Sequence, residues 1–467
     1  MDSTPLESRP QQDFLEALHG RLDRQLARAR ALASPEGLLS LSLRADQFPG
    51  NPGLPAEGPA VWWGRPADGR FRVGAGSAWE CEAAGKQRFR VLGEAHRALR
   101  SDWHAASLDD TPTLRAAFLG FAFSPGSADD TLPNALLCVP RVTVERRGVD
   151  TFMHFNGLAG DDPELLLEEW VRTARALTAA AWPGTRATDP VPHKVPAQVL
   201  PADDPAWAAR VRHALEAIRQ PPLEKLVLTR RVELELPAQP SVDRILEWLA
   251  ARYPEAAVFA VRREGASLVG ASPERLLGLE HGLVVADALA GSAPRATCDD
   301  ADQLLGGQLL GDPKELAEHA VVVREILGAL EPLCTALVAS HAPSLLRLPN
   351  VQHLASHVHG RVKPEVGVFE LLERMHPTPA VGGAPRAAAL EWLRSHGEAD
   401  RGWYTGGMGW VDDAGGDIWV ALRCAALRGQ IANLYAGAGI VAGSDPEQEL
   451  RETGWKLQAM LEALAVD

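Results

Sequence analysis

Residues 434–456, LYAGAGIVAGSDPEQELRETGWK, join a glycine-rich strand to a helix near the end of the sequence. A strand, a glycine turn and a helix also open a dinucleotide-binding βαβ unit, so this stretch decides between two fold classes. Only 24 residues follow Gly443, which is enough for one helix but not for a second parallel strand or a ribose-binding acid. The stretch therefore argues against a dinucleotide site, although a small anion could still approach the backbone at the helix start.

The helix in this stretch carries charges where its buried face begins. Asp445 as the N-cap, followed by a proline and a capping-box glutamine, predicts the helix start. At about 100° per residue, one arc of this helix is apolar and should face a core: Leu450, Leu457, Met460, Leu461 and Leu464. By the same count, Glu449, Glu452 and Lys456 cluster at the edge of that arc.

The rest of the sequence indicates an α+β fold. After Asp204, long helices and alternating strands follow one another without the regular βαβ order of a doubly wound fold. Earlier in the chain, we expect an amphipathic helix from about Phe14, strands within 117–123 and 141–149, and a helix around 164–181.

The segment richest in proline marks an internal boundary. Residues 182–205 hold six prolines in 24 residues, a composition typical of a linker. We therefore expect a disordered segment at 1–12, an N-terminal lobe at 13–182, a proline-rich connector at 183–205 and a C-terminal region at 206–467.

The composition is that of a globular protein, and it argues against some partners. The 467 residues are 46% hydrophobic and 23% charged, with a formal net charge of −14, so a nucleic-acid surface is not expected. The five cysteines show no CxxC spacing, the N-terminus lacks a signal-peptide pattern, and no eighteen apolar residues run together. We expect a cytoplasmic protein with free thiols and without a membrane span.

Two segments carry candidate acid–base residues. In 224–236, EKLVLTRRVELEL, alternation predicts a half-buried strand with Lys225 on one face. Such a lysine usually faces solvent, but in a pocket it can lose its proton and act as a base. In 268–277, LVGASPERLL, Glu274 follows a strand end among apolar residues. Either the charge of Glu274 stabilises the N-terminus of a following helix, or Glu274 has a raised pKa and serves as a general acid.

A second capped helix offers another carboxylate. In 311–330, GDPKELAEHAVVVREILGAL, the cap pattern of Asp312, Pro313 and Glu315 predicts the helix start. Glu318 lies on a polar stripe of this helix between valines. Glu318 either pairs with Lys314 on the surface or, with a carboxylate of another helix, holds a hard cation such as Mg²⁺.

Three histidines in HLASHVHG raise the question of a zinc site. His353, His357 and His359 lack the glutamate of the HExxH motif, and the strand-like sequence would not give helical ligand geometry. A zinc site is therefore not expected.

Taken in order, these segments resemble the chorismate-utilising enzymes, and within that family the isochorismate synthases. The matching segments lie between about residue 200 and residue 465: KLVLTR, GASPERL, ALAGSAPR, EHAVVV, NVQHLASHVHG, HPTPAVGGAPR, RGWYTGGMGWVD, ALRCA and YAGAGIVAGSDPEQELRET, followed by Lys456. The first 200 residues match more loosely, through FLGFAF and VPRV. The resemblance implies an α+β fold in which two lobes form a β-sandwich wrapped by helices. The active site would lie in the cleft between lobes, and 206–467 would be the chorismate-binding catalytic region.

The resemblance also implies the site residues. Glu318 and Glu452 would hold Mg²⁺, which binds the ring carboxylate of chorismate, with Glu449 in a second-shell or water-mediated position and Lys456 close by. The remaining implied substrate contacts are Arg423, Gly437 and Gly439 at the enolpyruvyl carboxylate, Gly291 at the ring carboxylate, and His353 and Tyr404 in the pocket lining.

The implied reaction moves a hydroxyl group from ring position 4 to position 2. Lys225 would take a proton from water as it attacks C2, and Glu274 would protonate the leaving C4 hydroxyl. Anthranilate synthases usually have glutamine where Lys225 stands, and aminodeoxychorismate synthases a lysine in PIKGT where this chain has ALAGS. Water is therefore the expected nucleophile, and a monomer without a glutaminase subunit the expected form.

Two alternatives remain. A salicylate synthase would share the first step and then expel pyruvate, and a non-catalytic regulator would only bind the ligand. The sequence does not distinguish supply of menaquinone, siderophore or salicylate synthesis.

Overall fold

The computed structural model describes residues 9–127, 132–182 and 204–465, with side chains from Phe14 onward. The helices of this part of the chain are α1 (Arg9–Arg30), α2 (Arg88–Ser101), α3 (Pro163–Ala179), α4 (Pro205–Ile218), α5 (Val242–Arg252), α6 (Asp299–Gly311), α7 (Pro313–Leu330), α8 (Val368–Met375), α9 (Arg386–Ser395) and α10 (Pro446–Leu464), with 3-10 turns η1 (Pro66–Asp68) and η2 (Glu331–Leu333).

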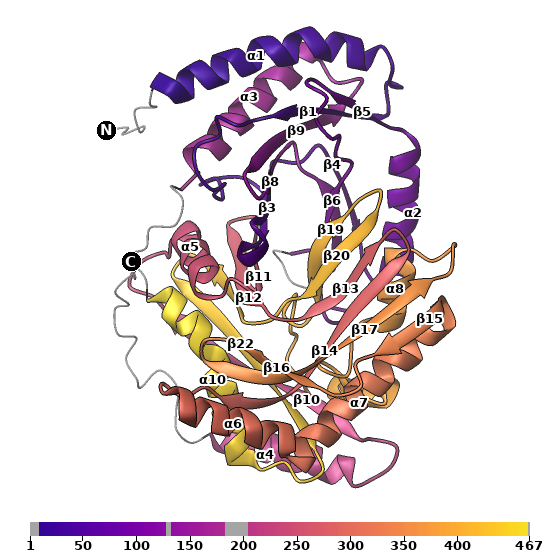
Figure 1. Cartoon of the computed structure of the whole chain (residues 1–467), viewed down its shortest axis with the longest axis vertical. Helices are drawn as coiled ribbons and strands as arrows, with labels where there is room; N and C mark the ends of the chain where they lie inside the picture. Colours follow the sequence, from indigo (N-terminus) through magenta and orange to yellow (C-terminus); the bar gives the residue numbers. More distant parts are fainter. Residues whose placement is uncertain (1–8, 128–131, 183–203, 466–467) are drawn as a thin grey trace.

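Two large sheets, in which nearly all neighbouring strands are antiparallel, form the body of the molecule (Figure 1). The twelve-stranded sheet has the order β18 (Gly383–Ala384), β10 (Lys225–Glu235), β22 (Ile431–Val441), β21 (Cys424–Arg428), β12 (Ala266–Ser272), β11 (Ala257–Arg263), β2 (Ala60–Arg65), β3 (Arg70–Ala75), β8 (Val142–Arg147), β9 (Asp150–Leu158), β1 (Leu38–Arg44) and β5 (Trp103–Ser107). The ten-stranded sheet has the order β15 (Cys334–Ala339), β17 (Val351–Val362), β14 (Leu283–Pro294), β13 (Arg275–Glu280), β20 (Gly415–Val420), β19 (Gly407–Val411), β6 (Ala117–Phe121), β7 (Ala135–Val139) and β4 (Trp79–Ala83), and β16 (Ser344–Arg347) pairs with β17. The predicted α+β class is confirmed.

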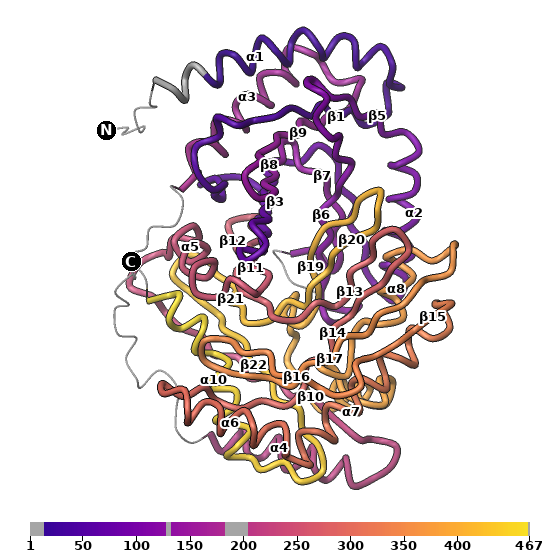
Figure 2. Tube along the Cα trace, in the orientation of Figure 1, coloured from indigo at the N-terminus to yellow at the C-terminus, as the bar shows by residue number. Residues whose placement is uncertain are grey.

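Both sheets continue from the N-terminal half of the chain into the C-terminal half. β11 pairs with β2 in one sheet, and β19 pairs with β6 in the other. In the tube view the purple β6 accordingly lies beside the orange β19 in the middle of the molecule (Figure 2). The predicted connector at 183–205 falls almost entirely outside the described residues, which resume at Asp204.

Apolar side chains fill three layers. Between the sheets lies an aromatic-rich cluster that includes Trp63, Phe118, Phe259, Trp403 and Trp410. The outer face of the twelve-stranded sheet packs against α1, α3, α5 and α10, and that of the ten-stranded sheet packs against α2, α7 and α8. This sandwich wrapped by helices is the architecture that the sequence predicted.

The final helix has the predicted start and the predicted buried face. The Asp445 side chain accepts hydrogen bonds from the backbone of Glu447 and Gln448, with proline at the first helical position. Four of the five arc residues are fully buried, and Leu464 is partly buried. The first helix differs from expectation, because it begins at Arg9 instead of near Phe14 and so within the segment expected to be disordered; residues 1–8 lie outside the described residues.

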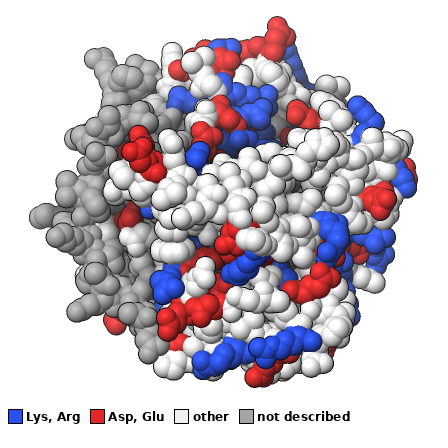
Figure 3. Space-filling view, turned by 60° about the horizontal axis from the view of Figure 1, so that its bottom comes forward, with Lys and Arg blue, Asp and Glu red and all other residues white. Residues whose placement is uncertain are grey.

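The surface carries both signs of charge. On the face shown in Figure 3, acidic and basic side chains are mixed around a broad uncharged area. Among the described residues, no helix is both long and apolar enough to span a membrane. The five cysteines are free, as expected, and two of them, Cys138 and Cys424, are buried.

Candidate active site

One enclosed pocket brings the predicted site residues together. Ten of the predicted residues line it: Glu274, Gly291, Glu318, His353, Tyr404, Arg423, Gly437, Gly439, Glu452 and Lys456. The other two predicted residues do not line the pocket. Lys225 lies directly behind Glu318 and contacts it, and Glu449 contacts Lys314. All lining residues fall within 227–456, so the cleft lies between the two sheets and the helices α7 and α10 of the C-terminal region.

Lys225 is buried directly behind the pocket wall. It is the first residue of β10 and only 1% exposed, and its Nζ lies 2.9 Å from Glu318 Oε1. The interpretation of Lys225 as a solvent-facing lysine is therefore wrong. The pairing of Glu318 with Lys314 is also wrong, because Lys314 instead contacts Glu315 and Glu449.

Glu274 is a buried carboxyl without a partner on one oxygen. It sits between β12 and β13, so it does not begin a helix as the alternative interpretation required. The residue is 2% exposed, and its Oε1 makes no hydrogen bond. Burial, and next the nearby Asp287 charge, raise the pKa of Glu274 to about 8. At neutral pH this carboxyl holds a proton, which a general acid requires.

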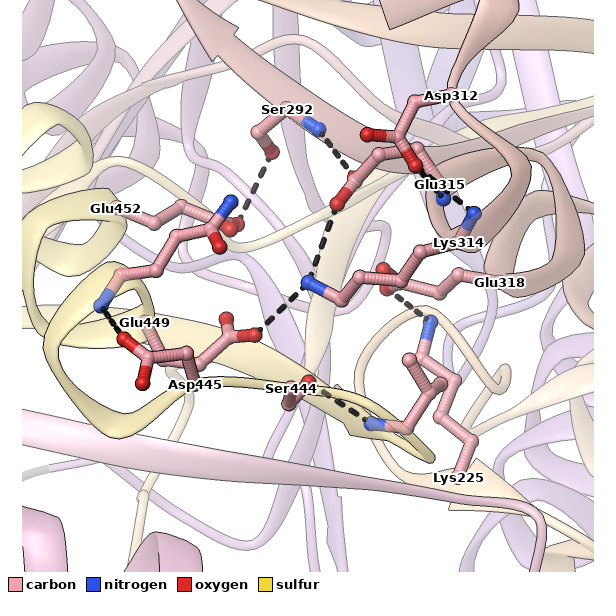
Figure 4. A network of polar contacts seen from close by, with 12 residues as sticks. Lys225, Ser292, Asp312, Lys314, Glu315, Glu318, Ser444, Asp445, Glu449 and Glu452 are labelled. Carbon is pink, nitrogen blue, oxygen red and sulfur yellow. Dashed lines mark hydrogen bonds and ion pairs between the residues drawn. The ribbon is translucent and has the colours of Figure 1, made fainter.

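Four carboxylates and three lysines meet between α7 and α10 (Figure 4). Glu318 pairs with Lys225, and Glu452 Oε1 lies 2.5 Å from Lys456 Nζ. Lys314 Nζ bridges the helices, 3.2 Å from Glu315 Oε1 and 3.1 Å from Glu449 Oε1. The same spacing, Glu-x-x-Glu, thus places two carboxylates from each helix in one cluster.

The pKa values show that this cluster is crowded with negative charge. Burial and the neighbouring Glu452 raise the pKa of Glu449 to about 7. Burial and Glu318 also raise the pKa of Glu315. Burial opposes ionisation of Glu452 too, but Lys456, Ser292 and Lys314 together outweigh it, so the pKa of Glu452 is lowered. A bound cation would relieve this repulsion.

The donor set fits Mg²⁺ better than a transition metal. The two candidate ligands, Glu318 and Glu452, are carboxylates, and among the described residues no group of three or more His, Cys, Asp or Glu side chains is arranged to hold a metal ion by itself. Mg²⁺ typically takes one or two carboxylates and completes its shell with water and substrate oxygens. Glu318 and Glu452, which both line the pocket, are the carboxylates that such an ion could share with a substrate.

Arg423 and His353 form another part of the pocket wall, in which Arg423 supplies a positive charge. Arg423 NH2 donates to His353 Nε2 over 2.7 Å, so the histidine must carry its proton on Nδ1, 3.2 Å from the Gly291 carbonyl oxygen. Burial and the Arg423 charge hold the pKa of His353 well below its ordinary value. His357 has a different environment, since its half-exposed ring pairs with Asp287 over 2.8 Å. A neutral His353 leaves the Arg423 charge available for an anion.

Two glycines leave room that a side chain would fill. A Cβ at Gly439 would lie 2.3 Å from Glu318 Oε1 and 2.9 Å from Lys225 Cε. Gly291 has φ +81°, a conformation that favours glycine, and its Cβ would lie 3.2 Å from Glu315 Oε2. Lys456 Nζ donates to the Gly437 carbonyl over 2.9 Å, which ties α10 to the same glycine-rich strand.

Comparison with known proteins agrees with this geometry. The family model described as chorismate binding enzyme matches residues 38–465. The chain belongs to the chorismate-binding enzyme family. It is 34% identical to the salicylate biosynthesis isochorismate synthase of Pseudomonas aeruginosa, over 98% of this chain and 96% of that protein. It is 30% identical to the isochorismate synthase MenF of Bacillus subtilis, over 93% and 92% respectively.

Solved structures of the chorismate-binding family share the fold. The menaquinone-specific isochorismate synthase MenF from Escherichia coli superposes with a TM-score of 0.77 at 24% identity, over 97% of this chain and all of that one. Anthranilate synthase component I from Streptococcus pneumoniae superposes with a TM-score of 0.65 at 21% identity, over 84% of this chain and 92% of that one. The predicted fold, with its two large sheets, is that of the family.

Sequence reasoning did not identify three polar residues in or beside this pocket, namely Ser292, Lys314 and Glu315. Ser292 donates from its hydroxyl to Glu452 Oε1 over 3.0 Å and from its backbone to Glu315 Oε2 over 3.1 Å. Glu315 was read only as a helix-cap residue, and Lys314 only as a surface partner of Glu318. The repeated Glu-x-x-Glu spacing on two helices was the signal that could have found Glu315.

Proposed function

We propose that this protein interconverts chorismate and isochorismate, with Mg²⁺ as cofactor. The observation that carries the proposal is the burial of a lysine, Lys225, directly behind the wall of the pocket that the buried carboxyl of Glu274 lines. Lys225 and Glu274 are the two groups that water attack and hydroxyl departure need, and aminating members of the resembled family usually lack the lysine. The two relatives matched over more than nine-tenths of their length carry isochorismate synthase in their names.

Substrate binding uses the charges of the two pocket walls. Arg423 and the backbone near Gly437 and Gly439 would hold the enolpyruvyl carboxylate. Glu318 and Glu452 would hold Mg²⁺, which supplies positive charge for the ring carboxylate near Gly291. Glu315 and Glu449, which lie behind these ligands, would accept hydrogen bonds from metal-bound water.

The proposed reaction transfers one proton to Lys225 and one proton from Glu274. A water oxygen bonds to C2 while Lys225, in its neutral form, takes one water proton. The ring double bonds shift, the C4–O bond breaks, and Glu274 gives its proton to the departing hydroxyl, which leaves as water. The reverse reaction begins with a protonated Lys225 and an ionised Glu274. The pocket's low exposure keeps both groups from exchanging protons with bulk solvent during the step.

Product analysis tests the proposal. Purified protein is incubated with chorismate in EDTA, and then with an excess of Mg²⁺, and the products are separated by chromatography. We expect no turnover in EDTA and, with Mg²⁺, a mixture of chorismate and isochorismate without pyruvate. Pyruvate with salicylate would assign a salicylate synthase, binding without turnover would assign a regulator, and full activity in EDTA would exclude the metal role.

The protein would act as a cytoplasmic monomer without a glutaminase subunit. Size-exclusion chromatography of the active enzyme can check that it is a monomer.

A further inference from the structure

One edge of the strand that begins with Lys225 lacks a full strand partner. β10 pairs with β22 along its whole length, but on its other edge β18 is opposite only Lys225 and Leu226. Beyond Leu226, the Val227 N–H donates to the Gly382 carbonyl over 3.2 Å. The Val227 carbonyl and the Thr229 backbone groups on that edge would be left without hydrogen bonds unless side chains supply them.

Side chains complete this edge. Val227 O accepts from Arg401 NH2 over 2.6 Å. Thr229 N donates to Glu398 Oε1 over 2.9 Å, and Thr229 O accepts from Arg210 NH1 over 2.9 Å. Glu398 joins the two arginines, with Arg401 NH2 3.1 Å from its Oε1 and Arg210 on its other oxygen. These three side chains act in place of a neighbouring strand.

Arg401 also makes contacts beyond its hydrogen bond to the edge of β10. Its side chain is 1% exposed, and its second nitrogen, NH1, donates to the Val381 carbonyl over 2.7 Å. The guanidinium also lies 4.2 Å from the centre of the Phe123 ring. Burying an arginine is costly unless it is paired and hydrogen-bonded, and here one planar group joins two backbone carbonyls.

Both of these carbonyls belong to residues of the pocket wall. Val227 lies two positions after Lys225 on β10, so their side chains share a face of the sheet. Val381 lies in the segment between α8 and β18 and lines the pocket across from that strand. Arg401 itself does not line the pocket, so it touches the two walls only from behind.

We propose that Arg401 is a positioning residue, which fixes the strand of Lys225 against the Val381 segment. The role rests on the proposed function, because it is defined by the distance between Lys225 and a substrate held by the other walls. The Val227 backbone N–H also donates to the Gly382 carbonyl over 3.2 Å, and Lys225 and Leu226 pair with β18. Loss of the Arg401 contacts would therefore leave the junction in place but allow small shifts of the strand against the segment. A shift of about 1 Å at a reacting group can cost about 10²-fold in rate even when binding survives.

Arg401→Lys tests the proposal, with Arg210→Gln as the matched control. Lysine keeps the charge opposite Glu398 but cannot donate in a planar fork to both carbonyls. We expect kcat to fall roughly 10- to 100-fold in Arg401→Lys, with KM nearly unchanged since Arg423 still binds substrate. Arg210→Gln loses the Thr229 bond on the same edge but touches neither Val227 nor Val381, so it should lower the melting temperature and leave kcat unchanged. Wild-type kcat in Arg401→Lys, or an equal loss of kcat in both variants, would overturn the proposal.

Two further measurements keep the test decisive. Hydrogen exchange of the peptide 225–231 should be faster in Arg401→Lys than in Arg210→Gln, and this comparison does not depend on which reaction the enzyme catalyses. If wild-type protein forms no isochorismate, the proposed function fails. The hydrogen-exchange comparison still tests whether Arg401 fixes the strand of Lys225. If Arg401→Lys does not fold, Glu398→Gln replaces it, because it removes the countercharge of Arg401 and keeps an acceptor for Thr229. A wild-type kcat in Glu398→Gln would then contradict the proposal.

Discussion

Lys225 Nζ lies 2.9 Å from Glu318 Oε1, so the proposed base and one proposed metal ligand are direct partners. The two proposed functions would therefore be coupled, because Mg²⁺ and the lysine side chain would compete for the same carboxylate. Gly439 is required at this contact, since a Cβ there would overlap Glu318.

Lys225→Ala should lower turnover and strengthen metal binding at the same time. Losing a general base should reduce kcat roughly 10²- to 10⁴-fold. Removing the competing ammonium should lower the Kd for Mg²⁺, measured by calorimetry without substrate. Arg231→Ala, which removes an exposed charge from the same strand, is the control and should change neither quantity. A Lys225→Ala enzyme as fast as wild type would remove the base from the mechanism.

Glu452→Gln should lose Mg²⁺-dependent activity while the fold survives. The carboxylate lies at the edge of the apolar face of α10, so the amide can occupy its place without disturbing the core. Circular dichroism and activity titrated with Mg²⁺ measure the two effects. Glu447→Gln, in the exposed first turn of the same helix, should behave as wild type. An unfolded Glu452→Gln protein would show that the residue is structural.

The pH profile should report the proton on Glu274. Because burial raises the pKa of this acid to about 8, it is protonated at neutral pH and loses its proton as the pH rises through 8. We expect kcat/KM for chorismate to fall above about pH 8. Asp287→Asn removes a charge that raises this pKa, so its descending limb should move to lower pH. A profile that stays flat up to pH 10 would contradict the assignment of Glu274 as the acid.

The buried Glu274 carboxyl should also make the protein less stable at high pH. The folded pKa of about 8 exceeds the ordinary value of 4.5, so between these values the folded state binds more protons. The free energy of unfolding therefore falls as the pH rises through this range. Glu274→Gln lacks this titration and should gain stability relative to wild type between pH 5 and pH 8.5 in urea unfolding. The exposed Glu280→Gln on β13 is the control, and an identical pH dependence in Glu274→Gln and wild type would contradict the burial of an ionisable acid here.

Local signals predicted some elements and could not predict others. The start and buried face of α10 were predictable because capping and helical periodicity depend on neighbouring residues. Alternation placed Lys225 on one face of β10, but it could not show that Glu318 of α7, about ninety residues later in the chain, lies against Lys225. Glu315 was missed for the same reason, because its cap pattern already explained it and its pocket contacts come from β14 and α10.

Incorporation of ¹⁸O from solvent tests the central claim of water attack at C2 most directly. Wild-type enzyme with Mg²⁺ and chorismate in H₂¹⁸O should give isochorismate that carries one ¹⁸O atom at C2 from the first turnovers onward. Mass spectrometry should find no ¹⁸O at other positions of that isochorismate, and prolonged incubation should label the C4 hydroxyl of the chorismate pool through the reverse reaction. Isochorismate without ¹⁸O would show that the C4 hydroxyl migrates within the substrate, and it would contradict the roles proposed for Lys225 and Glu274.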